Sequence, residues 1–282
     1  MISYHTFVTL FLIRHVAMDA WIKYRLSTIP KLFLIFFIFC LPFKSSMAIV
    51  QDETVTYRVG VSYINSYPLL SFANVDDKGY GWAVLEAFAK ANNVAFEYIG
   101  MPITRLQPSL DNGGLDFIFP DHPKWSNFRT ARQPNIYSGP IISTISATFV
   151  LSTNKNKQLE DLKSVAIPFG YTSYTWTQPI EKYGIKTVPV GDLRAALESV
   201  VNKRTDSADV EYNIGKHLID KYPHLQKLDI NKNYPNAEVN YHLSTIRHAD
   251  IAKRITAFID ANPSLISELK QKYNIKEHSE VY

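Results

Sequence analysis

The sequence predicts an α/β fold of two lobes, each a mostly parallel sheet flanked by helices, joined by two crossing strands. From Thr56 onward, strand-like apolar runs alternate with segments of helical periodicity, which is typical of parallel sheets with helical crossovers. The alternation occurs before and after residue 145, and no low-complexity linker separates the two series. Lobes that share short connecting strands can hinge around a cleft, where a small ligand would bind.

Residues 1–48 have the pattern of an export signal. Three basic residues, Lys23, Arg25 and Lys31, precede the apolar run of residues 32–41. Ser46 and Ala48 are the small residues that a signal peptidase recognises. As a helix this run covers about 15 Å, half of the ~30 Å hydrocarbon core. We therefore expect cleavage near Ala48 and a periplasmic protein, with translation from Met18 and an uncleaved N-terminal anchor as open alternatives.

The charge balance gives no indication of nucleic-acid binding. The chain has 30 basic and 26 acidic residues. Five of the basic and one of the acidic residues lie in residues 1–48, so the remainder carries no formal net charge, and no basic run interleaved with aromatics is present. The single cysteine, Cys40, lies in the apolar run without the small-residue surroundings of a lipoprotein site. The mature chain is expected to fold on its apolar core without disulfides.

The first series predicts a β-α-β-α-β unit. Strands are expected at residues 57–61, 94–99 and 115–119. Apolar residues recur at helical spacing between the first two strands, and Asn92-Asn93 ends that helix. A shorter helix over residues 105–110 stops at the glycine-rich turn of residues 112–114.

The second series repeats the pattern after residue 145. Strands are expected at residues 147–151, 165–168 and 186–190, with a further strand that runs from Asp206 and ends near Glu211. Helices are expected over residues 159–163, from Ser173 and from Asp192. The helix from Asp192 places four apolar residues on one face, namely Leu193, Ala196, Leu197 and Val200.

The C-terminal part is helical. Ile251, Ile255, Phe258 and Ile259 form an apolar stripe, and Asn262 followed by Pro263 predicts the start of another helix. The crossing strands are expected at residues 141–146 and 238–244. These limits assign residues 49–144 and 240–282 to lobe 1 and residues 145–239 to lobe 2.

Common catalytic signatures are absent from the sequence. There is no H-E-x-x-H, no nucleophile elbow and no P-loop, and Gly79-Tyr80-Gly81 is not a dinucleotide loop because Val84 occupies the third glycine position. His122 and the His242/His248 pair lack the spacing of a zinc site. We therefore expect no enzyme, no cofactor and no metal.

Candidate ligand-binding residues follow the strands, because ligands bind at the carboxyl ends of parallel strands. In the first lobe they are Tyr63, Asn65 and Tyr67. The two tyrosine rings could stack on a ligand, although Tyr67 could simply pack against Pro68. Asp121 and Trp125 follow the strand of residues 115–119. Trp125 could instead cover the interior of its own lobe.

The second lobe adds candidates at two strand ends. Thr172 and Ser173 follow the Gly170 turn at an expected helix start, where N–H groups could hold an anion. Ordinary N-capping by Ser173 is the simpler alternative. Glu211 is followed by Tyr212, and a carboxylate beside aromatics suits a cationic amine. A solvated surface glutamate is the alternative.

The sequence resembles the bacterial extracellular solute-binding proteins of family 3, which include the amino-acid receptors of ABC transporters. The resembling segments are YRVGV at 57–61, YPLLSF at 67–72, GW at 81–82, RL at 105–106 with Pro108 and Leu110, GLDF at 114–117, YSGP at 137–140, LEDLK at 159–163 and the Gly170 turn. Together they imply a type II periplasmic-binding-protein-like fold that closes on a small polar molecule.

The sequence also departs from the family pattern at one segment. Family members that bind amino acids carry a Thr-Pro-Glu-Arg-like segment whose arginine clamps the ligand carboxylate. Here residues 120–129 differ from it, and neither Arg129 nor Arg132 falls cleanly on the clamp position, although Arg129 remains a candidate. The family places its ammonium-binding carboxylate close to Glu211.

The expected function is that of a periplasmic protein that clasps a small polar solute, such as an amino acid or amine, for ABC-type uptake. Its expected partners are that solute and inner-membrane transporter or sensor subunits, with no nucleic acid, and the protein is expected to be a monomer. One alternative is a sensory module that acts on a membrane partner. Another is an enzyme that uses Glu211 or Asp121 as a general acid.

Overall fold

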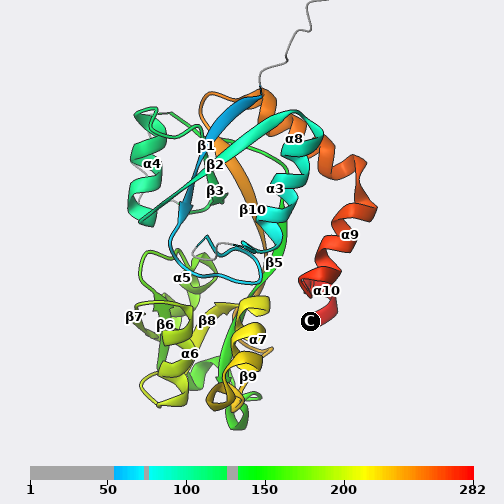
Figure 1. Cartoon of the computed structure of the whole chain (residues 1–282). Helices are drawn as coiled ribbons and strands as arrows, with labels where there is room; N and C mark the ends of the chain where they lie inside the picture. Colours follow the sequence, from blue (N-terminus) through cyan, green and yellow to red (C-terminus); the bar gives the residue numbers. More distant parts are fainter. Residues whose placement is uncertain (1–53, 73–75, 126–132) are drawn as a thin grey trace, which may run out of the picture. The chain divides into compact units, whose positions relative to one another are not determined.

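The strands form one mixed sheet in the order β2-β1-β3-β10-β5-β8-β6-β7, with β4 paired to β10 and β9 paired to β5 (Figure 1). The computed structural model describes residues 54–72, 76–125 and 133–282. The predicted export signal and its cleavage site lie outside these residues, as does Arg129.

The first lobe contains a parallel set of three strands with two crossover helices. Its elements are β1 (Val55–Ser62), α3 (Tyr80–Ala91), β2 (Val94–Met101), α4 (Ile103–Asp111) and β3 (Phe117–Asp121). Strand β1 pairs in parallel with both β2 and β3. Helix α3 begins after Gly79, whose φ of 90° favours glycine. The predicted β-α-β-α-β order is present, with each element shifted by a few residues.

The second lobe repeats this arrangement. Its strands and α-helices are β6 (Ser164–Pro168), α5 (Thr177–Tyr183), β7 (Lys186–Val190), α6 (Leu193–Val201), β8 (Ser207–Glu211) and α7 (Tyr212–Lys221), followed by the short β9 (Leu228–Ile230). Strand β6 pairs in parallel with β7 and β8. The Asp192 side chain caps α6 by accepting from Ala195 N at 2.7 Å. The predicted apolar face of α6 is buried.

Two long strands connect the lobes, as predicted. They are β5 (Ile142–Leu151) and β10 (Ala237–Thr245), which Figure 1 shows running from the first lobe into the second. The first half of β10 pairs antiparallel with β5, whereas His242 to Thr245 pair with β3 and with β4 (Ile136–Tyr137). The partner of β10 therefore changes between Tyr241 and His242. The residue limits of the two lobes stay a prediction.

The C-terminal helices are α8 (Ala249–Ala261), α9 (Pro263–Lys272) and α10 (His278–Val281). The predicted stripe of α8 packs on the core, with Ile251 and Ile255 fully buried. Asn262 precedes Pro263 as expected, but its side chain does not cap α9. Its Nδ2 donates instead to the Phe258 carbonyl at 2.7 Å, at the end of α8.

Some local expectations are wrong. The helix expected over residues 159–163 is only the 3₁₀ turn η2 (Leu159–Asp161), because the chain becomes extended at Leu162 before entering β6. The helix expected from Ser173 starts with η3 (Tyr174–Trp176), and α5 follows. Two further 3₁₀ turns are η1 (Ser152–Asn154), which follows β5, and η4 (Pro223–Leu225), which precedes β9. Helix α7, which contains Gly215, is absent from the predicted elements.

That glycine is required by packing. A Cβ on Gly215 would lie 2.2 Å from Cζ of Phe149, a buried residue of β5. The helix therefore approaches the sheet more closely than any other residue type would allow at this position.

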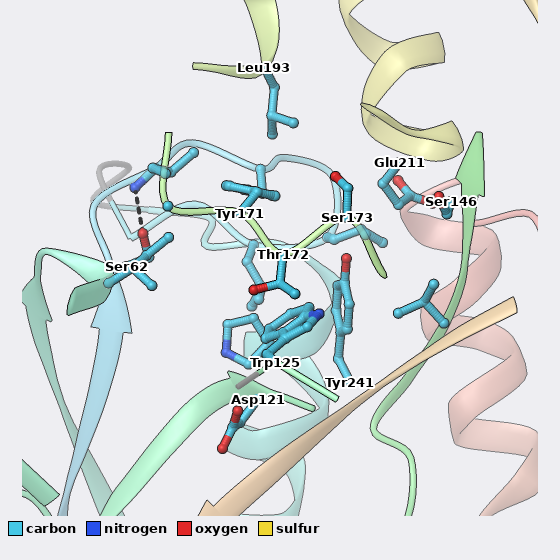
Figure 2. Close-up of a pocket in the computed structure, with 18 of the residues that line it drawn as sticks. Ser62, Asp121, Trp125, Ser146, Tyr171, Thr172, Ser173, Leu193, Glu211 and Tyr241 are labelled. Carbon is cyan, nitrogen blue, oxygen red and sulfur yellow. Dashed lines mark hydrogen bonds between the residues drawn. The ribbon is translucent and has the colours of Figure 1, made fainter. Parts of the chain in front are cut away.

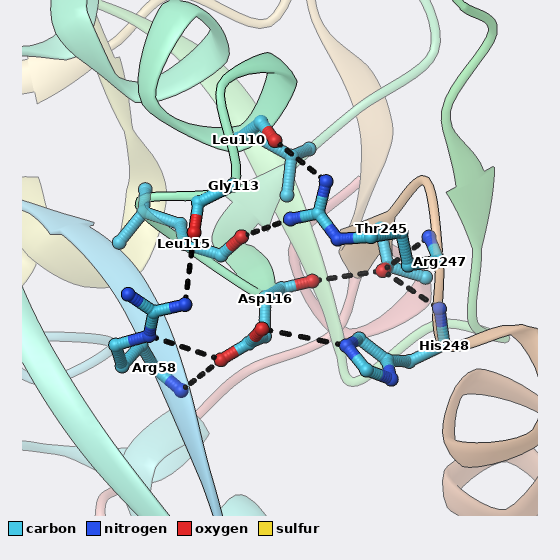
Figure 3. A network of polar contacts seen from close by, with 8 residues as sticks. All are labelled: Arg58, Leu110, Gly113, Leu115, Asp116, Thr245, Arg247 and His248. Atoms are coloured by element: carbon cyan, nitrogen blue, oxygen red, sulfur yellow. Dashed lines mark hydrogen bonds and ion pairs between the residues drawn. The ribbon is translucent and has the colours of Figure 1, made fainter.

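A polar network fastens the turn before β3 to its neighbours (Figure 3). Asp116 accepts hydrogen bonds from Arg58 N at 2.8 Å and Arg58 Nε at 3.3 Å, and His248 Nε2 donates to it at 3.4 Å. Burial alone would raise the pKa of Asp116, but the Arg58 hydrogen bonds and charge, with His248, hold that pKa below its usual value. Arg247 donates to the carbonyls of Leu110 and Leu115, so the α4–β3 turn is held from both sides.

The depressed pKa of Asp116 gives a pH-dependent contribution to stability. Because ionised Asp116 is favoured in the folded state, this contribution is present above the unfolded pKa of about 3.9 and is lost as pH falls through the folded-state pKa. We expect Asp116→Asn to lower the urea midpoint at pH 7 and to flatten its fall between about pH 5 and pH 2. Asp260→Asn, at an exposed position on α8, is the control. If the urea midpoints of wild type and Asp116→Asn fell equally with pH, the depressed pKa of Asp116 would be contradicted.

Candidate ligand-binding site

A cavity of about 180 Å³ is lined by residues of both lobes (Figure 2). Its described lining combines carboxylates, aromatic rings and apolar side chains. The carboxylates are Asp121, Asp209 and Glu211, and the aromatic residues are Phe72, Trp125, Tyr171, Tyr174 and Tyr241. Leu69, Leu70, Ile103, Leu106, Ile118, Leu193, Ile214 and Val239 supply much of the apolar surface.

One side of the cavity is a face of the antiparallel ribbon β10-β5-β8. Directly opposed residues of an antiparallel pair share a face, and Val239 pairs with Thr144 while Ser146 pairs with Glu211. Residues two positions apart on a strand also share a face, which adds Tyr241 and Asp209. The alternate residues, including Ile145, Ala147 and Val210, are buried in the core on the other face.

The Glu211 carboxylate is surrounded by donors. Thr144 Oγ1 donates to it in a very short contact, Asn213 Nδ2 donates to Oε1 at 2.8 Å, and Ile145 N lies 3.4 Å from the same oxygen. Its other oxygen accepts from Ile214 N at 2.8 Å, which caps α7. Burial raises the pKa of Glu211, while hydrogen bonds led by that of Thr144 favour its ionised form. The surface-exposed alternative for Glu211 is wrong, since the residue is only 8% exposed.

Asn213 connects this carboxylate to the C-terminal segment. Lys276 N donates to Asn213 Oδ1 at 2.7 Å, and Asn213 Nδ2 donates to the Lys276 carbonyl at 3.1 Å. The same amide group donates to Glu211. The backbone after α9 is thereby tied to the first turn of α7.

Asp209 is a cavity carboxylate that has few donors. Ser146 Oγ donates to its Oδ1 at 3.1 Å. Burial raises the pKa of Asp209, whereas hydrogen bonds from the hydroxyls of Ser173 and Ser146 and from the Trp176 indole favour its ionised form. Asp209 was not among the residues predicted from sequence.

Asp121 is engaged within its own lobe. Ser244 Oγ donates to Oδ2 at 2.6 Å, Asn135 Nδ2 donates to the same oxygen at 3.2 Å, and His122 N donates to Oδ1 at 2.7 Å. Figure 2 shows the carboxylate pointing away from Thr172, toward the first lobe. Asp121 lines the cavity, but its oxygens face these neighbours.

Trp125 and Tyr241 form an aromatic pair beside the cavity. Their ring centroids lie 5.2 Å apart, and in Figure 2 the Tyr241 hydroxyl points toward Ser173. Burial raises the pKa of Tyr241 well above its ordinary value, and the negative charge of Glu211 adds to this effect. Trp125 therefore both lines the cavity and packs on a crossing strand.

The loop after β6 brings the second lobe against the first. Gly170, with a φ of 87°, permits the turn, and Tyr171 Oη then lies 3.4 Å from Ser66 Oγ. The Tyr174 ring stacks on His122 at a centroid distance of 5.5 Å. Thr172 and Ser173 line the cavity between these contacts. Ser173 makes no capping hydrogen bond with its side chain, and the three-residue turn η3 follows it in place of the expected helix start.

Three predicted residues, Tyr63, Asn65 and Tyr67, lie away from the cavity lining. Tyr63 is 66% exposed, and its ring lies over Gly100. The Tyr67 hydroxyl donates to Asp77 at 3.4 Å, and its ring packs edge-on against His217 of α7 at 4.9 Å. Asn65 accepts from Tyr67 N at 3.1 Å, which shapes the turn after β1.

The sequence carried a signal for Asp209 that the prediction missed. In β8, residues Ala208 and Val210 are apolar and buried, whereas Asp209 and Glu211 alternate with them. Period-two alternation therefore places both carboxylates on the face opposite the core. Tyr171, Tyr174 and Tyr241 had no comparable local signal, because they reach the cavity through loop and crossing-strand geometry.

The described residues contain neither a metal-binding cluster nor a helix that could span a membrane. Within residues 54–72, 76–125 and 133–282, no group of three or more His, Cys, Asp or Glu residues could hold a metal ion. His242 Nδ1 donates to the Ser138 carbonyl at 2.8 Å, and His122 Nδ1 accepts from Lys124 N at 3.0 Å. No helix in the same described ranges has both the length and the apolar character that a bilayer crossing requires.

Known proteins share the fold rather than the sequence. No protein-family model matches the chain, and no curated protein sequence matches it. Solved structures with 18% identity or less include an ancestral arginine-binding protein bound to arginine, at a TM-score of 0.63 over 78% of this chain and 99% of that one. Another is an arginine transport-system periplasmic binding protein from Legionella pneumophila, which is 14% identical and also has a TM-score of 0.63. The match covers 78% of this chain and 100% of that one.

A third similar structure is a histidine kinase sensor domain described as similar to periplasmic binding proteins. It is 19% identical, with a TM-score of 0.61 over 79% of this chain and 97% of that one. These likenesses confirm the predicted fold class: the chain has the two-lobed α/β fold of the type II periplasmic binding proteins. The resemblance to the solute-binding proteins is confirmed at the level of the fold.

The link between Asn213 and the C-terminal segment can be tested by substitution. Asn213→Ala removes hydrogen bonds to Glu211 and to both backbone groups of Lys276, and leaves buried polar groups without partners. We expect the free energy of unfolding to fall by about 1–3 kcal/mol. We also expect amide exchange at residues 276–282 to accelerate more than exchange in β1. Unchanged exchange at the C-terminus would contradict this link.

Proposed function

We propose that this chain is a periplasmic solute-binding protein that clasps a small polar molecule with a cationic group between its two lobes. One observation carries the proposal: the cavity between the lobes is lined by buried carboxylates together with aromatic rings. We further propose that the exported, monomeric protein delivers this solute to an ABC-type transporter.

Electrostatics favours a cationic ligand in this cavity. Burial raises the pKa of both Asp209 and Glu211, which means that their ionised forms are disfavoured by desolvation. A bound cation would offset that cost, and the faces of Trp125, Tyr174 and Tyr241 suit ammonium or guanidinium groups. An amine, or an amino acid with a basic side chain, fits both requirements.

Contacts across the cleft support closure around a ligand. Tyr171 of the second lobe meets Ser66 of the first, and Tyr174 stacks on His122. These pairs lie on loops, whereas the lobes are connected by β5 and β10. Loops that meet across a hinge can separate to admit a solute and return to cover it.

The similar structures support a role in solute transport, and one of them supports a sensory role as a second candidate. Two of them are arginine-binding proteins, one described as part of a transport system. The sensor-domain structure favours, as a second candidate, a sensory module that acts on a membrane partner. An enzymatic role for Glu211 or Asp121 is less favoured, because hydrogen bonds within the protein engage both carboxylates.

Thermal unfolding with a panel of small molecules tests the charge preference. We expect L-arginine, L-lysine, agmatine or putrescine to raise the Tm of the mature protein by about 5–10 °C at concentrations near 100 Kd. Succinate and L-glutamate should shift it far less, because their carboxylates would meet those of the cavity. A larger shift with the anions than with every cation would overturn the proposal.

Trp125 gives an optical test of where the solute binds. Its ring lines the cavity, whereas Trp176 is fully buried and Trp82 lies on α3. We expect a stabilising cation to change the intrinsic fluorescence of wild type and of Trp82→Phe, but to leave that of Trp125→Phe nearly unchanged. Loss of the change in Trp82→Phe instead would place the binding event elsewhere.

A further inference from the structure

We infer that Asp209, rather than Glu211, is the counter-ion for the cationic group of the ligand, and that Glu211 acts as a structural cap beneath the site. This inference rests on the proposed function and assigns the binding role within it. The three cavity carboxylates differ in how far donors within the protein occupy their hydrogen-bonding capacity.

Glu211 has little capacity left for a ligand. An ionised carboxylate offers about four lone-pair positions. Glu211 receives Thr144 Oγ1, Asn213 Nδ2 and Ile145 N on one oxygen and Ile214 N on the other. These donors belong to β5 and α7, so Glu211 joins a crossing strand to a helix start. A ligand ammonium would have to displace one of these bonds.

Asp121 is occupied in a similar way. Its Oδ2 accepts from Ser244 and Asn135, and its Oδ1 accepts from His122 N. The carboxylate also points toward the first lobe in Figure 2. Asp121 therefore forms part of the cavity wall, while its carboxylate oxygens bind groups of the first lobe.

Asp209 differs from both in its partners. They are the hydroxyls of Ser146 and Ser173 and the indole N–H of Trp176, with Ser146 Oγ at 3.1 Å from Oδ1. These three neutral donors leave part of the carboxylate's accepting capacity of about four lone pairs unused and do not neutralise its charge. A serine hydroxyl can also rotate, so each can accept from a ligand once the carboxylate is bound to the cation.

The surroundings of Asp209 fit a group with several N–H donors. Ser146, Ser173, Tyr174 and Tyr241 line the same cavity. Burial, followed by the charge of Asp209, raises the pKa of Tyr174, which is consistent with their proximity. An ammonium has three donors and a guanidinium five. Asp209, the serine oxygens and the aromatic faces could together satisfy either group.

Asp209→Asn and Glu211→Gln separate the two roles. The probes are L-arginine and agmatine, measured by calorimetric titration, with the Tm of each unliganded variant measured alongside. For Asp209→Asn we expect an unliganded Tm equal to or above that of wild type, because a buried charge is removed. Its affinity for the bound probe should fall about 10- to 100-fold.

Glu211→Gln should show the opposite pattern. The glutamine replaces one acceptor oxygen by an NH₂ group, which would face the donors of Thr144, Ile145 or Ile214. The unliganded Tm should therefore fall by about 3–10 °C. Probe affinity of the folded protein should fall by less than for Asp209→Asn. Asp161→Asn, an exposed change in the same lobe, is the matched control for lost charge.

The outcomes distinguish the inference from the proposed function. If wild type binds neither L-arginine nor agmatine, the proposed cationic ligand fails and the inference fails with it. If wild type binds and Asp209→Asn binds equally well, only the inference fails. Loss of binding in Glu211→Gln at an unchanged unliganded Tm would also overturn it. Should Asp209→Asn not fold, Asp209→Ser removes the same charge and is judged by the same affinity loss.

Discussion

The cavity depends on one geometric constraint, the alternation of side chains along the antiparallel ribbon β10-β5-β8. Strands β5 and β8 present their apolar alternate residues to α6 and α7, so their intervening residues emerge on the opposite face, which Val239 and Tyr241 of β10 share. That face carries Ser146, Asp209, Glu211 and Tyr241. Because β5 and β10 also connect the lobes, the connecting strands supply one wall of the cavity.

Burying two carboxylates on this face has a cost in stability. Their pKa values are raised by desolvation, which means that the unliganded protein holds charge in an unfavourable environment. Glu211 recovers part of this cost through its bonds to β5 and α7. Asp209 accepts fewer hydrogen bonds within the protein, and under the proposed function a cationic solute would supply the remaining stabilisation.

The C-terminal segment contributes to this arrangement at a distance from the ligand. Asn213 bonds to Glu211 on one side and to both backbone groups of Lys276 on the other. Tyr273 Oη, at the end of α9, donates to Asp77 of the first lobe at 2.8 Å. A few residues thus contact both lobes outside β5 and β10.

The amino-acid sequence by itself determined most of the strand and helix order and the crossing strands, because these depend on local periodicity. It also carried the resemblance to solute-binding proteins, through short segments such as those at 57–61 and 67–72. It also indicated Asp121, Trp125, Thr172, Ser173 and Glu211, all of which line the cavity. Only the tertiary structure decided which carboxylates are occupied by internal donors, since Ser244, Asn135 and Thr144 are distant in sequence from the groups they bind. It likewise brought Tyr171, Tyr174 and Tyr241 to one cavity, because closure of two lobes sets contacts that no local pattern records.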